Sequence, residues 1–171
     1  GDFGPALKEH FTRRVLVGQC AKVFDPIGLV TPITARLKLD LHQTCRMGLD
    51  WDDPVPEDFL PSWVSNLEDI QLIKHIRFKR TIIPADAVNT SVNLLVAVDA
   101  SQDIAVAVIY ARVLRKTGEY SCQLLMGRSK LISGSTIPRA ELKSAVMGAT
   151  SAHMIRRNLG DQCGSTIYIS D

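Results

Sequence analysis

The 171-residue sequence predicts an α/β (α+β) fold, in which a small helical region over residues 1–90 precedes a mixed β-sheet with a crossover helix over residues 91–171. Apolar residues in the first region recur at helical spacing, whereas after Ile76 they fall into short runs separated by turns. A single long helical pattern lies before the last of these runs. Strands joined by turns, then a helix and another strand, indicate a sheet that a helix covers on one face.

Three helices are expected in the first region. The first covers residues 12–24 and ends at the turn sequence DPIG. The second covers residues 31–48, where Thr31 can cap the helix and Pro32 lies in its first turn. The third covers residues 59–76 and again shows apolar residues at helical spacing. Together these helices predict a small bundle.

The strands of the second region are recognised by their shorter period. Residues 76–83 alternate as an edge strand that Pro84 ends. The sequence KTGE is typical of the turn of a β-hairpin. Further strands are expected at residues 92–99, 104–114, 120–127 and 165–171.

A long helix is expected over residues 133–160, between the last two strands. Ser135 or Thr136 can cap it, Pro138 fits its first turn and Gly160 closes it. Its small residues allow it to lie close to a sheet. The apolar stripe expected to face that sheet consists of Leu142, Ala145, Val146 and Ala149.

Three acids lie at the ends of these elements. Asp99 ends the strand NLLVAVD, Glu141 falls in the first turn of the long helix, and Asp171 ends the last strand. A right-handed crossover would place the last strand parallel to and beside the first, so that Asp99 and Asp171 become neighbours within reach of Glu141. Three carboxylates so close repel one another unless a cation neutralises them. Oxygen ligands alone favour Mg²⁺ or Mn²⁺ over zinc.

Two other interpretations of acidic residues were weighed. Asp52 and Asp53 could suggest the paired acids of a polymerase palm, but such a pair needs a tight strand–turn–strand, and prolines follow at once. They are therefore interpreted as loop residues. Asp99 could also be the nucleophile of a phosphotransferase like the haloacid-dehalogenase-like hydrolases. Those enzymes need a second acid two positions on, where this chain has Ser101.

The composition excludes several classes of protein. With 46% hydrophobic and 22% charged residues, no apolar run long enough for a bilayer and no signal peptide, we expect a soluble intracellular protein. The four cysteines are scattered without a C-x-x-C pair, which indicates neither a zinc site nor a disulfide framework. The chain begins without methionine and ends directly after a strand, so we expect an excised piece.

The order of elements resembles the ribonuclease H fold, and the whole chain is similar to a more particular family, the polyprotein of BEL/Pao long-terminal-repeat retrotransposons. In the first region the resemblance lies in KVFDPIGLVTPITARLKL and GLDWDDPVP. In the second it lies in VAVDAS, IYAR, GRSKL, IPRAELKSA and the final ISD. The resemblance implies a thumb or connection region of the reverse transcriptase, followed by the N-terminal part of the ribonuclease H domain.

The resemblance implies two-metal hydrolysis of the RNA strand of RNA·DNA hybrids, with Mg²⁺ or Mn²⁺ as cofactor. By position, Asp99 resembles the carboxylate that bridges two metal ions, and Glu141 and Asp171 resemble its catalytic partners at one of them. Lys130 and Arg139 are candidates for phosphate contacts. Expected partners are the hybrid and the remaining polyprotein domains, with no membrane, in the cytoplasm (in virus-like particles) or in the nucleus.

Two departures from the family pattern leave an alternative open. The family's fourth acidic ligand follows the third, and this sequence stops at Asp171, so the piece alone is expected to be inactive and its ribonuclease H fold truncated. Ala105 and Ala107 stand where related domains commonly carry glycine. The alternative is a non-catalytic connection or scaffold segment that binds nucleic acid or other polyprotein domains.

Overall fold

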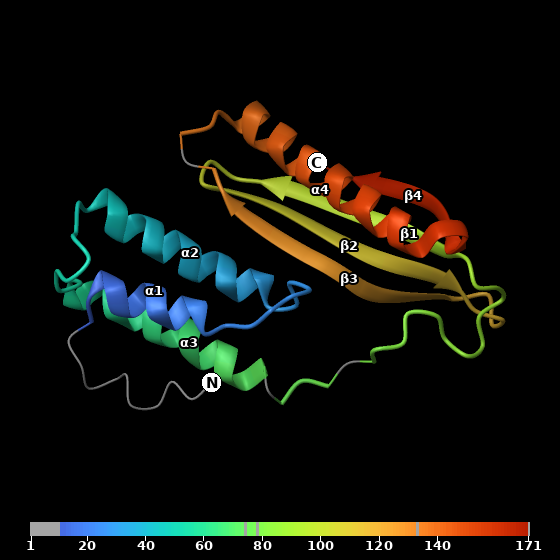
Figure 1. The fold of residues 1–171 in the computed structure, drawn as a ribbon, viewed down its shortest axis with the longest axis horizontal. Helices are drawn as coiled ribbons and strands as arrows, with labels where there is room; N and C mark the ends of the chain where they lie inside the picture. The colour runs from blue at the N-terminus through green and yellow to red at the C-terminus, as the bar shows by residue number, and fades with distance from the viewer. Residues whose placement is uncertain (1–10, 74, 78, 133, 171) are drawn as a thin grey trace. The chain divides into compact units, whose positions relative to one another are not determined.

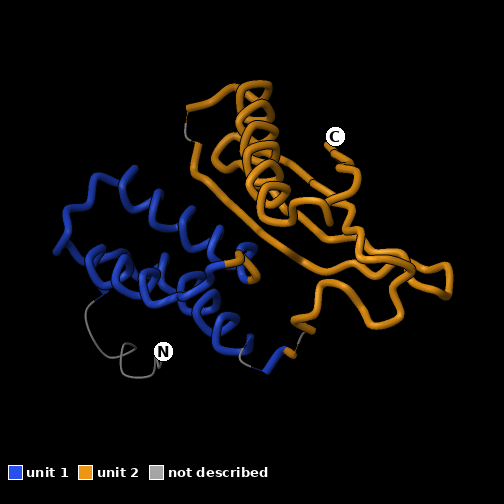
Figure 2. The backbone as a smooth tube through the Cα atoms, turned by 45° about the vertical axis from the view of Figure 1, so that its right-hand side comes forward, with its two compact units in different colours: residues 1–26, 30–76 blue, residues 27–29, 77–171 orange. Residues whose placement is uncertain are grey.

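The chain divides into two compact units, residues 1–26 with 30–76 and residues 27–29 with 77–171 (Figure 2). The computed structural model describes residues 11–73, 75–77, 79–132 and 134–170. Within these residues there are four α-helices and one four-stranded mixed sheet, which confirms the α+β fold predicted from the sequence. No helix among them has the length and apolar character needed to cross a membrane.

The first unit contains three helices where the sequence predicts them, together with the short 3-10 helix η2. Their bounds are α1 Arg13–Ala21, α2 Thr31–Arg46, η2 Glu57–Phe59 and α3 Leu60–Ile73. Apolar side chains from each α-helix form one core, in which the indole nitrogen of Trp63 donates a hydrogen bond to Oε1 of Gln19 at 2.7 Å. Thr31 is the first residue of α2 and not its cap, because Val30 takes that position without a side-chain cap.

The second unit contains the sheet and the long helix α4 (Figure 1). The strands are β1 Val92–Ala100, β2 Ile104–Leu114, β3 Tyr120–Leu131 and β4 Cys163–Ile169, and α4 covers Ile137–Leu159. The strand order is β3-β2-β1-β4, with β1 antiparallel to β2 and parallel to β4. The predicted crossover is therefore confirmed, because β4 returns beside β1 after α4.

The predicted edge strand over residues 76–83 is wrong for the residues that the structure describes. Its described residues form no strand, and Phe78 lies outside them. Ile82 and Ile83 pack against the core of the second unit instead. Alternating apolar residues make a strand only when the segment pairs with a sheet, and the two edges of this sheet are β3 and β4, to which the described residues of 76–83 add no strand.

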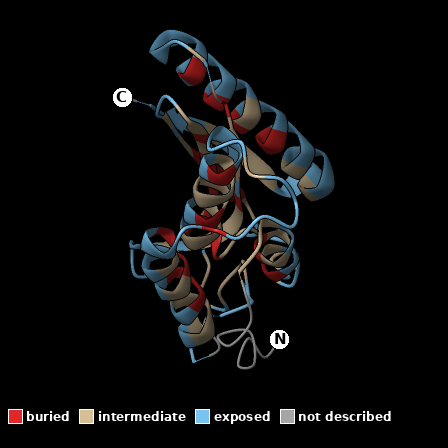
Figure 3. Cartoon of the chain, turned by 90° about the vertical axis from the view of Figure 1, so that its left-hand side faces the viewer, coloured by how far each residue is buried: buried red, intermediate tan, exposed pale blue. Residues whose placement is uncertain are grey.

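The helix α4 packs on β1 and β2 with one buried side, which is coloured red along the helix in Figure 3. The buried residues of α4 are Ala140, Ser144, Gly148, Ser151 and Ala152. The predicted buried stripe is wrong, since Ala145 and Ala149 are exposed and Leu142 and Val146 remain 65% and 56% exposed. A Cβ on Gly148 would lie only 2.5 Å from Cγ1 of Val98, so the close approach of helix and sheet leaves no room for larger residues.

We expect Gly148→Ala to destabilise the protein by about 1–3 kcal/mol, because the added methyl group must displace the stiff side chain of Val98. Gly18→Ala in α1 is the matched control, since no atom lies within 4 Å of the added methyl group. It should stabilise the protein by about 0.5–1 kcal/mol. Urea unfolding of both variants measures the difference, and equal stability of the two would contradict the close packing.

Burial in the first unit predicts unequal thiol reactivity. Burial, with a smaller contribution from the charge of Asp40, raises the pKa of the Cys20 thiol to about 11. Because the thiolate is the reactive form, iodoacetamide at pH 8 should modify the exposed Cys45 and Cys122 well before Cys20. Mass spectrometry of timed samples measures this order. Modification of Cys20 at the rate of Cys45 in the folded protein would show that the thiol is not buried.

Candidate functional site

The alternation of β1 determines which way Asp99 faces. Val92, Leu94 and Val96 are buried, and Val96 and Val98 lie against Gly148 of α4. Since successive residues of a strand point to opposite faces, Asp99 belongs to the face of the sheet away from α4. Its side chain is exposed at the end of β1.

A serine of α4 holds the backbone at Asp99. The buried hydroxyl of Ser144 lies 2.8 Å from the carbonyl oxygen of Asp99 and 2.6 Å from that of Val106. Asp99 and Val106 are paired across β1 and β2, so one hydroxyl proton, shared between two carbonyls, ties the helix to both strands. Sequence reasoning missed Ser144. The sequence feature that could have identified it is a serine within a series of small residues spaced four apart along the helix, Ala140, Ser144 and Gly148.

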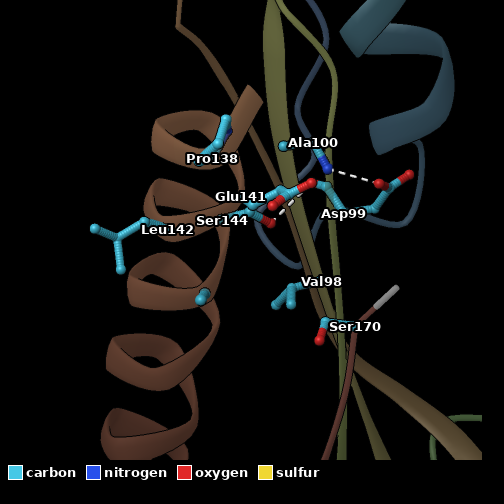
Figure 4. Close-up of a pocket in the computed structure, with 9 residues that line it drawn as sticks. Val98, Asp99, Ala100, Pro138, Glu141, Leu142, Ser144 and Ser170 are labelled. Atoms are coloured by element: carbon cyan, nitrogen blue, oxygen red, sulfur yellow. Dashed lines mark hydrogen bonds between the residues drawn. The ribbon is translucent and has the colours of Figure 1, made fainter. Parts of the chain in front are cut away.

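The carboxylate of Asp99 is held by its own strand. Its Oδ1 accepts a hydrogen bond from the amide of Ala100 at 2.7 Å. Figure 4 shows the carboxylate extending away from α4, while Ser144 reaches the carbonyl of the same residue. Its second oxygen, Oδ2, has no hydrogen-bond partner among the residues that the structure describes and is available to a ligand.

Asp99 and Glu141 line the same pocket, of about 290 Å³, between the end of β1 and the start of α4. Glu141 is exposed and is the fifth residue of α4, so it lies just past the first turn in which the sequence placed it. Ser170, which follows β4, also lines the pocket. Asp171 lies outside the described residues, so of the three predicted ligands the structure brings two together.

The donor set of the pocket fits a hard divalent cation. Asp99 and Glu141 supply only carboxylate oxygens, and no histidine or cysteine lines the pocket. Within residues 11–73, 75–77, 79–132 and 134–170, no group of three or more His, Cys, Asp or Glu side chains could hold a metal ion. A cation in this pocket would therefore need further ligands from outside this range, from water or from a substrate.

The two predicted phosphate contacts lie apart from the acids. Lys130 is an exposed residue of β3 and lines a second groove, between β3 and α4. Arg139 is exposed near the start of α4 and lines neither the acid pocket nor this groove. Neither cation is therefore part of the acid pocket.

The loop interpretation of Asp52 and Asp53 is confirmed. Asp52 forms a salt bridge with Arg14, with Oδ1 2.8 Å from Nε and Oδ2 3.0 Å from Nη2. That hydrogen bond lowers the pKa of the Asp52 carboxyl group. Asp53 accepts a hydrogen bond from the amide of Asp50. Both acids thus have local structural roles.

Comparison with known protein families decides the assignment of the chain. The family model for the Pao retrotransposon-like RNaseH-like domain matches residues 12–171. The chain belongs to this family. The resemblance to BEL/Pao retrotransposons is thereby confirmed, and the molecule is a Pao retrotransposon-like RNaseH-like domain.

Other comparisons of this Pao retrotransposon-like domain are more distant. A solved structure of a foamy viral protease-reverse transcriptase (dRH), in complex with double-stranded DNA, is 9% identical with a TM-score of 0.41. The match covers 92% of this chain and 35% of that chain, so the domain spans about a third of that protein's length. No curated protein matches the sequence.

We expect Ser144→Ala to destabilise the Pao retrotransposon-like domain by about 1–3 kcal/mol, because two partly buried carbonyl groups lose the donor that they share. Thr150→Ala is the control, since Thr150 is exposed on the same helix and donates only to the carbonyl of Val146. It should change stability by no more than about 0.5 kcal/mol. Thermal unfolding compares the two variants, and equal effects would show that Ser144 does not anchor α4.

Proposed function

We propose that this domain binds divalent cations at the acid pocket and that, in the complete polyprotein, it cleaves the RNA strand of RNA·DNA hybrids. The observation that carries the proposal is that Asp99 and Glu141, which are 42 positions apart in the sequence and belong to a strand and a helix, line one pocket. Ser170, the residue directly before Asp171, lines it as well.

In this proposal each acid has a separate role. Asp99 would be the ligand shared by two metal ions, and Glu141 and Asp171 would help to hold one of them. Because Oδ1 of Asp99 accepts a hydrogen bond from the amide of Ala100, a cation would first meet the other carboxylate oxygen, Oδ2. Bound Mg²⁺ or Mn²⁺ would supply an activated water and stabilise the leaving oxygen. Ser144 fixes the backbone from which the Asp99 carboxylate projects.

The proposed substrate is recognised by its shape and backbone. Proteins read A-like helices through 2′-hydroxyls and phosphates more than through base sequence. Lys130 and Arg139 are exposed cations on β3 and α4 that can contact those phosphates. The partners proposed for the domain are the hybrid and the other domains of the polyprotein, in the cytoplasm or nucleus.

One observation favours a second candidate function, a non-catalytic segment that binds nucleic acid. Figure 4 shows the Asp99 carboxylate turned away from α4, and its hydrogen bond to Ala100 needs no cation. A scaffold domain would keep this arrangement in the presence of Mg²⁺. Cleavage of the hybrid therefore has to be measured both in the parent and in variants in which each acid is replaced.

In the parent polyprotein, Asp99→Asn, Glu141→Gln and Asp171→Asn should each reduce Mg²⁺-dependent cleavage of an RNA·DNA hybrid by about a hundredfold or more. Changes to groups that only orient metal ligands already cost about 10–100-fold, and these variants remove the ligand charge itself. Gel analysis of a labelled RNA strand measures the rate. Asp161→Asn, which changes an exposed acid beyond the other end of α4, is the control and should cleave at the parental rate.

Parental activity in Asp99→Asn would exclude the two-metal assignment. Cleavage absent from the parental polyprotein, with hybrid binding retained, would favour the scaffold function. Without metal, neither Asp99→Asn nor Glu141→Gln should lower the melting temperature, because both side chains are exposed.

A further inference from the structure

A second groove lies in the same unit, on the α4 side of the sheet. Because α4 packs on β1 and β2, the edge strand β3 is left with open space between it and the helix. This groove has a volume of about 560 Å³. We call it the β3–α4 groove, and its lining includes Arg128, Lys130, Leu142, Lys143, Val146 and Met147.

The helix wall of the β3–α4 groove contains three apolar side chains beside Lys143 and Thr150. Leu142 and Val146, one helical turn apart, remain 65% and 56% exposed, and Met147 lies beside them. The small residues of α4 face the sheet, so its larger aliphatic residues are left on the outside. When a partner covers aliphatic side chains that are gathered in a groove, their removal from water favours binding.

The charges around the groove all have one sign. Arg128 and Lys130 are two positions apart on β3 and so share a face, while Lys143 projects from the helix wall. Among the described residues none of the three is in a salt bridge. Arg128 donates weakly to the hydroxyl of Ser151 at 3.4 Å, and Lys143 donates to that of Ser135. No acidic residue lines the groove in the part of the chain that the structure describes.

We propose that the β3–α4 groove binds an amphipathic helix of a partner protein that carries acidic residues beside aliphatic ones. Aliphatic residues of the partner would cover Leu142 and Val146, and its carboxylates would pair with Lys130 and Lys143. A helix fits better than an added strand, because the amide of Gly127 on β3 already donates to the carbonyl of Ile27 at 2.7 Å.

The chemistry of the lining favours a protein over a nucleic acid. A phosphate backbone would pair with the three cations but would gain little from Leu142 and Val146, and no aromatic side chain lines the groove for bases to stack on. The proposed site is separate from the acid pocket and does not depend on metal binding or hydrolysis. Lys130 is shared with the proposed hybrid contacts, whereas Leu142 and Val146 are not. The Leu142 and Val146 variants therefore distinguish a failure of this proposal from a failure of the proposed nuclease activity.

The test uses the full chain and a displayed library of 16-residue alanine-based helical peptides whose surface positions vary among Glu, Lys, Leu and Ala. Enriched peptides should carry Leu at i, i+3 or i+4, and i+7, with Glu on both sides. Affinities of the enriched peptides are then measured by fluorescence anisotropy. Enrichment of Lys-rich peptides, or no enrichment, would overturn the proposal.

Paired variants localise the binding. Leu142→Ser with Val146→Ser, and Lys130→Gln with Lys143→Gln, should each weaken peptide binding by about tenfold or more, since each pair removes one half of the recognition. The matched control is Met154→Ser with Arg157→Gln, two exposed residues of α4 outside the groove, which should bind as the parent does. Equal melting temperatures confirm that each variant folds.

The same variants distinguish a nucleic-acid site. RNA·DNA hybrid binding that falls about tenfold in the lysine pair and is unchanged in the Leu142 and Val146 pair, without any enriched peptide, would assign the groove to nucleic acid and overturn the proposal. Peptide binding that survives both groove pairs would also overturn it, because the peptides would then bind elsewhere on the chain.

Discussion

The close approach of α4 to β1 and β2 is the constraint on which the rest of the second unit depends. Gly148 leaves no space for a side chain against Val98, and the hydroxyl of Ser144 is shared between the carbonyls of Asp99 and Val106. A larger residue at either position would push the helix from the sheet. Packed interiors tolerate little added volume. The positions of these small residues therefore determine how the start of α4 is placed against the ends of the strands.

Two surfaces follow from that approach. At the start of α4, Glu141 comes to the same pocket as Asp99, whose backbone Ser144 holds in place. On the outside of the helix, Leu142 and Val146 remain exposed because the sheet is contacted by small residues. One packing arrangement thus provides an anionic pocket suited to a cation and a cationic groove with an aliphatic wall.

The sequence predicted the four strands of the sheet and the crossover, and it placed Asp99 near Glu141, which line one pocket, but it did not predict the side-chain directions. Period-two runs and the right-handed crossover rule correctly placed β4 beside β1. The buried face of α4 was assigned wrongly because Leu142 and Val146 are more apolar than Ser144 and Gly148, and hydrophobicity alone ignores how near a backbone must come. The strand predicted at residues 76–83 was wrong for a similar reason, because periodicity shows an alternation of apolar residues but not whether the segment pairs with the edge of a sheet.

The central claim is that the pocket at Asp99 and Glu141 holds a divalent cation. Its most direct measurement is a Mn²⁺ titration of the isotopically labelled full chain, followed by paramagnetic broadening of backbone amide signals. We predict that the signals of Asp99, Ala100 and Glu141 broaden first and that Asp99→Asn abolishes this selectivity. Broadening that begins instead in the acidic loop at residues 50–58, with the Ala100 amide unaffected, would contradict the claim.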